Sequence, residues 1–354
     1  GEGAARIPLS QARANAIQLD WDNYTPPKPS FLGVKVLEDY PLEDLIERID
    51  WLPFFNAWGL AGTFPAILTD KVVGSEANKL YIDAQVMLRQ IVSEKWLTAR
   101  GVFGFWPANR AENGDDIILF KDDNRKEETT RLHHIRQQMD KKRGGYNQCL
   151  SDFVAPLNPH GLGCPCCTGK LDLPARHIRD YVGGFAVCAG FGIDEHVARF
   201  ESEHDDYHSI MLKALADRLA EAFAERLHER VRKEYWGYAK DENLDNDALI
   251  AEKYRGIRPA PGYPANPEHT EKGILWELLK PNESIGLEIT ESYAMYPTAA
   301  VSGWYFAHPE SRYFGVGAIG RDQVEDYAQR KGMSIAEAER WLAPNLGYDP
   351  EEFN

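Results

Sequence analysis

One stretch of regular hydrophobic spacing constrains the fold of this 354-residue chain more than any other feature. Between residues 207 and 236, large apolar side chains recur at every fourth position: Met211, Leu215, Leu219, Phe223, Leu227, Val231 and Tyr235. Residues four apart lie on one face of an α-helix, so this row predicts a single long helix with one buried face. Asp205 and Asp206 suit its beginning, and Gly237 suits its end. At about 1.5 Å per residue, such a helix is roughly 45 Å long and braces a whole domain.

The remaining elements come as groups of strands and groups of helices. Helices are expected at residues 42–49, 75–96, 321–331 and 335–342. Strands are expected at residues 31–36, 101–106, 116–120, 287–295, 301–306 and 313–319. A short turn joins the last two strands, which favours antiparallel neighbours. Because strands and helices do not alternate strictly, the sequence predicts an α+β fold with a mainly antiparallel twisted sheet.

The tail of the chain carries clear helix signals. Gly332 suits the end of the first tail helix, because glycine readily adopts the left-handed conformation found there. Ser334 followed by Glu337 has the spacing of a capping box at the start of the second.

Composition excludes several classes of function. A net charge of −15 opposes binding to nucleic acid, whose phosphates are neutralised by Lys and Arg. No stretch has the roughly 20 apolar residues that cross a bilayer, and the first residues lack the pattern of a signal peptide. We therefore expect a cytoplasmic protein without nucleic-acid or membrane partners. Because the chain starts with Gly1, we also expect a fragment of a longer protein.

The most informative short motif is Arg-Pro-Ala-Pro-Gly-Tyr-Pro at residues 258–264. Its three prolines stiffen the chain and remove N–H donors, so the segment suits neither a helix nor a central strand. It places a permanently charged guanidinium, Arg258, and a phenol ring, Tyr263, on one rigid loop. The guanidinium could clamp a carboxylate with two parallel hydrogen bonds. Local chemistry alone leaves open a proline-rich surface turn.

A glycine motif, G-x-G-x-x-G, occupies residues 315–320 between an expected strand and an expected helix. Such a motif in a βαβ unit binds dinucleotides. The residues that follow predict two helices and no strand, so no βαβ unit can be completed. We therefore interpret the glycines as sites of close packing within a sheet.

Cysteines cluster at Cys164, Cys166 and Cys167, near His160 and His177. Thiolates and imidazoles are good zinc ligands, but Cys-x-Cys-Cys differs from the usual zinc knuckle. The surrounding prolines and glycines suit an exposed loop. We expect reduced thiols and no zinc site, with these cysteines as the remaining metal candidates.

Several segments, in the same order along the chain, give the sequence a family resemblance. They lie at residues 49–55, 101–109, 213–225, 258–264, 268–272, 301–306 and 321–327. Together they resemble the C-terminal activation domain of cobalamin-dependent methionine synthase, from about residue 20 to residue 348. The match over nearly the whole chain is far more specific than any single motif.

The resemblance implies a single C-shaped or helmet-like α+β domain that binds S-adenosylmethionine. Residues 1–30 would be an interdomain linker, and residues 31–354 the activation domain. In the family, this domain supplies the methyl group for reductive methylation of inactive cob(II)alamin, which a neighbouring cobalamin-binding domain holds. The electron comes from flavodoxin or a flavoprotein reductase. Such a fragment of the methyltransferase would not make methionine alone.

The resemblance also implies a set of ligand residues and no catalytic residue. The S-adenosylmethionine contacts would fall on Asp50, Arg258, Tyr263, Tyr313 and Phe314, with Glu221 and Glu252 as further members. This set agrees with the chemistry of the ligand, because an arginine suits its carboxylate and acidic residues suit its ammonium and sulfonium groups. The aromatic pair suits the adenosine, and Tyr263 would lie close to the corrin.

Two other classes of function remain as alternatives. A free-standing methyltransferase would need its own acceptor pocket, and the sequence offers no Rossmann-type donor site for one. A pure interaction module would bind the flavoprotein and have no affinity for S-adenosylmethionine.

The cysteine-containing loop, about residues 158–177, is an extra segment relative to the family pattern. Because it lies outside every segment that carries the resemblance, we predict that deletion of residues 158–170 leaves the affinity for S-adenosylmethionine nearly unchanged. Equilibrium binding to the two proteins checks this. A large loss of affinity, or stoichiometric zinc in the purified parent, would show that the cysteines have a role.

Overall fold

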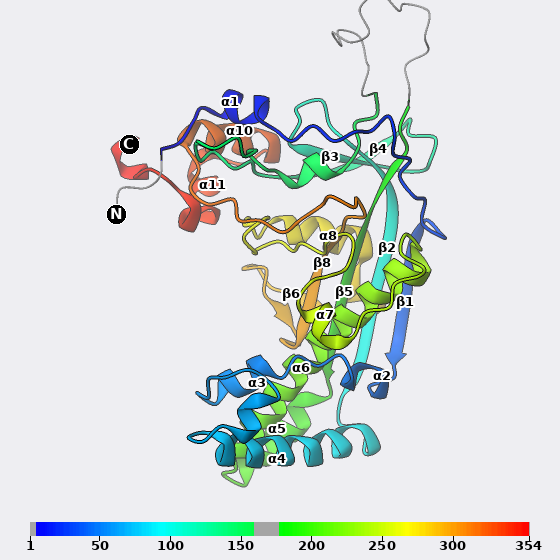
Figure 1. The fold of residues 1–354 in the computed structure, drawn as a ribbon, viewed down its shortest axis with the longest axis vertical. Coiled ribbons are helices and arrows are strands. Elements are labelled where there is room, and N and C mark those ends of the chain that lie inside the picture. The colour runs from blue at the N-terminus through cyan, green and yellow to red at the C-terminus, as the bar shows by residue number, and fades with distance from the viewer. Residues whose placement is uncertain (1–4, 159–176, 354) are drawn as a thin grey trace, which may run out of the picture.

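The centre of the fold is a mainly antiparallel sheet (Figure 1). The computed structural model describes residues 5–158 and 177–353. Its largest sheet has six strands in the order β4-β3-β2-β5-β8, and β1 also pairs with β2. The strands are β1 (Gly33–Tyr40), β2 (Thr98–Arg110), β3 (Asp116–Phe120), β4 (Glu128–His133), β5 (Asp180–Phe191) and β8 (Ala300–Tyr305). All five pairings are antiparallel, as the sequence predicted.

Strand β5 is buried on both faces, with only its last residue partly accessible. Alternate side chains of a strand point to opposite faces. Phe185 and Val187 accordingly join the core cluster that contains the long helix, whereas Ala186 and Cys188 join the cluster beneath α8 (Glu271–Leu279). The sheet is therefore a central layer with a hydrophobic core on each side.

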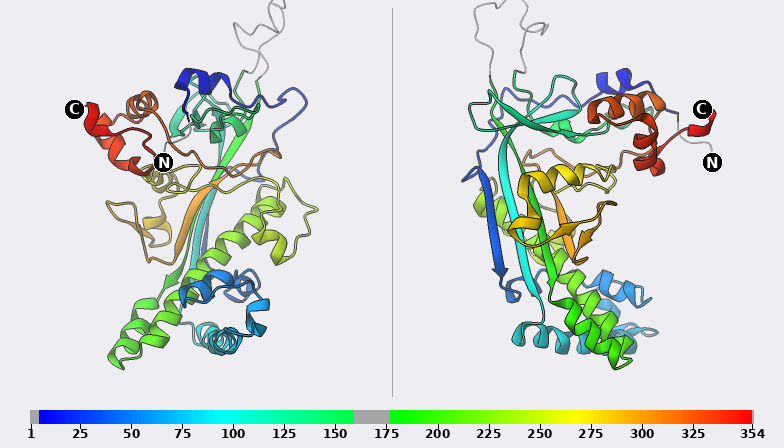
Figure 2. Two further views of the ribbon diagram at one scale, coloured as in Figure 1. Left: turned by 60° about the vertical axis from the view of Figure 1, so that its left-hand side comes forward. Right: turned by 180° about the vertical axis from the view of Figure 1, so that it is seen from behind.

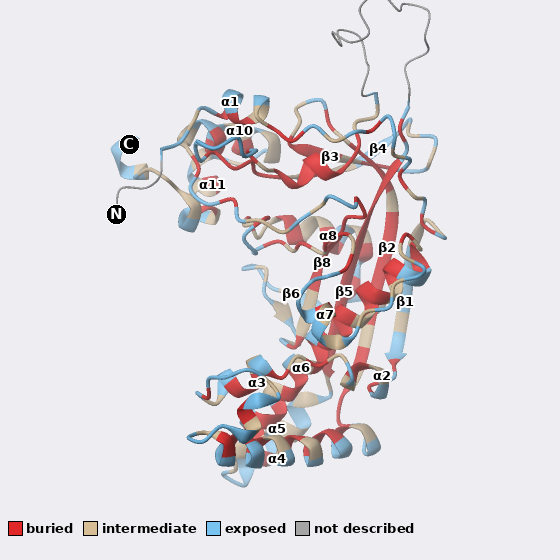
Figure 3. Ribbon diagram, viewed as in Figure 1, coloured by how far each residue is buried: buried red, intermediate tan, exposed pale blue. Residues whose placement is uncertain are grey.

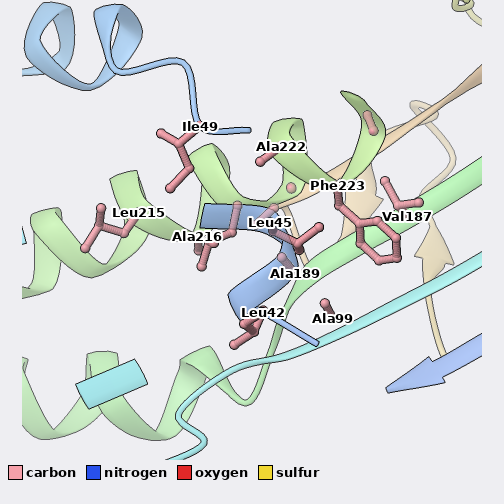
Figure 4. Packing of buried hydrophobic residues seen from close by; sticks show 14 of the residues in the cluster. Leu42, Leu45, Ile49, Ala99, Val187, Ala189, Leu215, Ala216, Ala222 and Phe223 are labelled. Atoms are coloured by element: carbon pink, nitrogen blue, oxygen red, sulfur yellow. The ribbon is translucent and has the colours of Figure 1, made fainter. Parts of the chain in front are cut away.

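The predicted long helix is confirmed as α6 (Asp206–Arg230), which continues into a π-helical turn, Val231–Tyr235. The Asp205 side chain accepts the His208 N–H at its start, and Gly237 has a φ of +83° just past its end. The apolar row is buried along its length and packs against β5 and the helices near the lower end of the sheet (Figure 4).

The other helices are α1 (Leu9–Ala14), α2 (Glu43–Ile46), α3 (Leu52–Ala57), α4 (Gly74–Ser93), α5 (Ile193–Ser202), α7 (Asn246–Ile250), α9 (Pro281–Ser284), α10 (Arg321–Lys331) and α11 (Ile335–Trp341). Six of them gather in two groups at opposite ends of the sheet. Helices α3, α4 and α5 lie at one end, and α1, α10 and α11 at the other (Figures 1 and 2). Both groups project to the same side of the sheet, which gives the described chain its C-like outline. No described helix is long and apolar enough to span a bilayer.

The tail helices lie where the sequence placed them. Gly332, with a φ of +71°, ends α10, and the Ser334 hydroxyl accepts the Glu337 N–H at the start of α11. Buried side chains from α10 and α11 form a separate small core together with Ile135, Val316 and Ile319.

Two strand predictions are wrong. Residues 313–319 form no strand, because their backbone bonds go to two separate loops: Val316 N–H donates to Pro264 and Ile319 N–H donates to Asn345. The expected strand at 287–295 is instead a hairpin of two-residue strands, β6 (Glu288–Ile289) and β7 (Met295–Tyr296). A turn with Tyr293 at a φ of +64° reverses the chain between them.

The segment before the sheet lies against the domain rather than apart from it. Leu9, Ala12 and Trp21 are buried, and the Arg13 guanidinium pairs with Asp115 and Asp326. Figure 3 shows α1 and the segment after it lying along the upper part of the domain. Whether residues 1–30 also connect to another domain stays a prediction.

One glycine of β8 couples the sheet to the proline-rich loop. A Cβ on Gly303 would lie 2.7 Å from the Pro259 carbonyl oxygen and 3.2 Å from the Phe185 ring. We predict that Gly303→Ala destabilises the fold by about 1–3 kcal/mol, because the backbone must move to relieve this contact. Denaturant unfolding measures the change. Gly145→Ala is the control, since its nearest contact would be 3.7 Å; equal stability of the two variants would contradict the argument.

Candidate functional site

A polar stripe interrupts the buried surface of α6. Glu221, Glu225, His228 and Arg232 follow one another at spacings of four, three and four residues, so they lie along one side of the helix. Glu225, His228 and Arg232 are buried. Ionisable groups are rarely buried unless they are paired, so this stripe marks a place where other polar groups must meet the helix.

The proline-rich loop, residues 258–264, is the element that meets this polar stripe. Pro259 accepts the Trp304 N–H at 2.8 Å, which fixes the loop to β8. Gly262 has a φ of +93°, and its N–H donates to Asn266 at 2.8 Å. A Cβ on Gly262 would lie 2.5 Å from the His269 ring. The turn therefore needs glycine both for its backbone conformation and for the space beside His269.

Arg258 joins the loop to the helix. Its Nη2 donates to Glu225, and its Nη1 lies 3.0 Å from His228 Nδ1 and 3.3 Å from the Tyr254 hydroxyl. The Arg258 backbone N–H donates to the Tyr313 hydroxyl at 2.9 Å. These contacts use three of the five guanidinium N–H donors, so two donors remain for the carboxylate clamp that the sequence predicts.

Electrostatics keep this arginine charged and its histidine neighbour neutral. Burial opposes the charge of Arg258, but Tyr254 and Glu225 raise its pKa above the ordinary value. Burial, reinforced by Arg232 and Arg258, lowers the pKa of His228 well below its ordinary value. A neutral His228 can accept the Arg258 hydrogen bond on Nδ1 only if its proton is on Nε2.

Two adjoining cavities open around Arg258. The polar cavity, of about 280 Å³, is lined by three arginines and four carboxylates. The aromatic cavity, of about 480 Å³, is lined by Tyr254, Tyr263, Tyr313 and Phe314 among others. Glu221, Glu252 and Arg258 line both, so the two cavities share one wall.

All seven residues predicted as ligand contacts line these cavities. Asp50 lies in the polar cavity, at the start of α3, where its carboxylate accepts the Leu52 N–H at 3.1 Å. Tyr263, Tyr313 and Phe314 line the aromatic cavity. The other three, Glu221, Glu252 and Arg258, lie in the wall that the two cavities share. The structure thus brings together residues spread over more than 260 positions of sequence, from Asp50 to Phe314.

Two carboxylates of the shared wall lie where charge is costly. Burial raises the pKa of Glu221, with Arg218 and Arg258 opposing the change. Burial also raises the pKa of Glu252, and Arg258 again opposes it. A cation placed beside them would offset this cost and favour their charged forms.

The sequence analysis did not predict three residues of the site: Glu225, His228 and Tyr254. The first two could have been found, because they lie in the polar stripe within the strongest apolar helix of the chain. Tyr254 carried no such signal, since only the tertiary fold brings its hydroxyl within 2.8 Å of the Tyr313 hydroxyl.

The metal candidates Cys164, Cys166 and Cys167 lie outside the described residues, as does His160. Among residues 5–158 and 177–353, no group of three or more His, Cys, Asp or Glu side chains is arranged to hold a metal ion.

Comparison with known proteins assigns the chain to a family. Residues 41–332 match the family of the activation domain of vitamin B12 dependent methionine synthase. The chain belongs to this family. A similar solved structure is the MetH reactivation domain bound to AdoHcy, with 54% sequence identity and a TM-score of 0.89. The match covers 97% of this chain and 99% of that one.

Membership of the activation-domain family confirms the predicted family and fold class. The chain is a mixed α+β activation domain of the cobalamin-dependent methionine synthase family, and so part of that enzyme.

The buried His228 gives the activation domain a specific pH dependence. In the unfolded chain a histidine has a pKa of about 6.5. Because the folded pKa is lower, the unfolded state takes up a proton first as the pH falls, so this contribution to stability is complete above that pH and is lost below it.

We predict that His228→Gln, which keeps an acceptor for Arg258, loses less stability than the parent between pH 7 and pH 5. One proton corresponds to at most about 1.4 kcal/mol per pH unit. Denaturant unfolding at several pH values gives the slope of the unfolding free energy against pH for each protein. At pH 8, where histidines are neutral in both states, the two slopes should be equal. Identical slopes from pH 7 to 5 would contradict a neutral buried His228.

Proposed function

We propose that this domain binds S-adenosylmethionine across the polar and aromatic cavities and presents its methyl group to cobalamin held by a neighbouring domain. One observation carries the proposal: all seven predicted contacts converge on the two cavities. The chain is also 54% identical to a reactivation domain bound to AdoHcy, which is the same molecule without the methyl group.

The charges of the two cavities are complementary to this ligand. The two remaining N–H donors of Arg258 suit the ligand carboxylate. Asp50, Glu221 and Glu252 suit its ammonium and sulfonium groups, because opposite charges attract most strongly where water is excluded. Tyr313 and Phe314, in the aromatic cavity, suit the adenosine. Each end of the ligand thus has a matching wall.

The acceptor would lie at the open side of the aromatic cavity. Tyr263 is 59% exposed there, so its ring can contact a large planar partner without any rearrangement of the loop. Cobalamin, when held by its own domain, supplies the cobalt atom that accepts the methyl group. This chain holds and orients the donor, and AdoHcy remains after transfer.

The partners follow from the same proposal. They are the cobalamin-binding domain of the same enzyme and flavodoxin or a flavoprotein reductase, which supplies the electron in the cytoplasm. We expect cobalamin alone to bind the isolated domain weakly, because the neighbouring domain holds it.

The ligand role of Arg258 is best tested by Arg258→Lys. Lysine keeps a charge beside Glu225 but cannot make two parallel hydrogen bonds to a carboxylate. A hydrogen bond to a charged group contributes about 1.5–3 kcal/mol, so Arg258→Ala should raise the Kd for S-adenosylmethionine roughly 10- to 150-fold. Arg258→Lys should recover only part of that loss. Equilibrium titration, with melting curves for each variant, measures both effects.

Arg340→Ala, an exposed arginine of α11, is the matched control and should bind like the parent. Because Arg258→Ala also leaves Glu225 without its guanidinium partner, some loss of stability is expected for that variant alone. If Arg258→Lys binds S-adenosylmethionine like the parent, Arg258 is not a ligand contact. Absence of saturable binding by the parent at millimolar ligand would contradict the proposed function itself.

A further inference from the structure

A third cavity, of about 530 Å³, adjoins the polar cavity but contains none of the proposed ligand contacts except Asp50. Its walls come from the end of α2, the α2–α3 connection, the loop between α3 and α4, the middle of α4, and α7. We call it the Trp51 pocket. It shares Asp50 and Ile250 with the polar cavity, so the two cavities are neighbours.

Three aromatic rings form one side of the Trp51 pocket. The Trp51 and Tyr81 ring centroids are 5.1 Å apart at 74°, and those of Phe64 and Tyr81 are 5.5 Å apart at 42°. Trp51 and Phe64 are 6.3 Å apart at 37°. The three rings therefore pack against one another, and all three line the pocket. Aromatic rings carry negative charge on their faces, so rings in the wall of a cavity favour a cation there.

The charged residues that line the pocket are all acidic. They are Glu47, Asp50 and Asp247, and no Lys, Arg or His is among the described residues that line it. Arg48, which lines the neighbouring polar cavity, has its guanidinium 3.0 Å from Glu229 and 4.0 Å from Glu47. The pocket thus excludes anions, and a neutral apolar ligand would gain nothing from the three carboxylates.

We propose that the Trp51 pocket binds a small alkylated cation, such as a quaternary ammonium head group. Aromatic faces and carboxylates both favour such a cation, because its charge is spread over methyl groups that can contact the rings directly. The volume is ample for one head group. This proposal goes beyond the proposed function and does not depend on it, since the three rings lie outside the S-adenosylmethionine contacts.

The test compares choline with 3,3-dimethyl-1-butanol, its uncharged isostere, in titrations of the whole chain without S-adenosylmethionine. Calorimetry or ligand-observed NMR follows binding. We expect saturable binding of choline in the millimolar range and binding of the neutral isostere at least about tenfold weaker. Equal binding of the two compounds, or no saturable binding of choline, would overturn the proposal.

Two variants assign the binding to this pocket. Tyr81→Leu keeps an apolar surface but removes one ring, and it should weaken choline about fivefold or more while leaving the isostere unchanged. Asp247→Asn removes an exposed carboxylate and should also weaken choline. Because Asp247 is exposed on the surface of a short helix, this variant should fold even if Tyr81→Leu does not.

Matched controls use the same substitutions at exposed residues outside the pocket. Tyr146→Leu and Asp39→Asn should bind choline like the parent. If these controls weaken binding as much as the pocket variants, choline binds elsewhere and the proposal is wrong. A chain that binds S-adenosylmethionine but not choline contradicts this inference alone, whereas the reverse result contradicts only the proposed function.

Discussion

The ion pair between Arg258 and Glu225 connects the two elements on which the site depends. Glu225 belongs to the long helix α6, and Arg258 begins the loop that is fixed to β8 through Pro259 and Trp304. Both side chains are largely buried, at 19% and 10% exposed. Removing either partner would leave the other charge without compensation, which is far more costly than the loss of a surface pair. The geometry of both cavities therefore depends on this contact.

The ion pair is held in place by the burial of α6. The apolar row of the helix packs against β5 and the neighbouring helices, and this contact fixes the rotation of the helix about its axis. With that rotation fixed, Glu221 and Glu225 face the proline-rich loop. Hydrophobic packing thus determines where the charges lie, although it supplies none of the site chemistry.

The sequence predicted some of the elements and missed others, among them α5, α8 and β5. Helices α4, α6, α10 and α11 were found because their apolar residues recur at helical spacing or their ends carry capping residues. Strand β5 was missed, since burial on both faces removes the alternation that identifies a strand. Residues 313–319 were taken for a strand because their apolar content is the same whether their partners form a ladder or two separate loops.

The sequence by itself determined the long helix and the rigid loop with Arg258 and Tyr263, and the family resemblance supplied the seven proposed ligand residues. Only the tertiary structure decided that these residues surround two adjoining cavities. It also decided that Glu225, His228 and Tyr254 use three of the N–H donors of Arg258. Trp51, Phe64 and Tyr81 line a separate pocket for the same reason. The physical reason is the separation in sequence between the residues that interact. Periodicity and capping act between residues a few positions apart, whereas a buried ion pair or a group of rings forms between residues that only the packed core brings together.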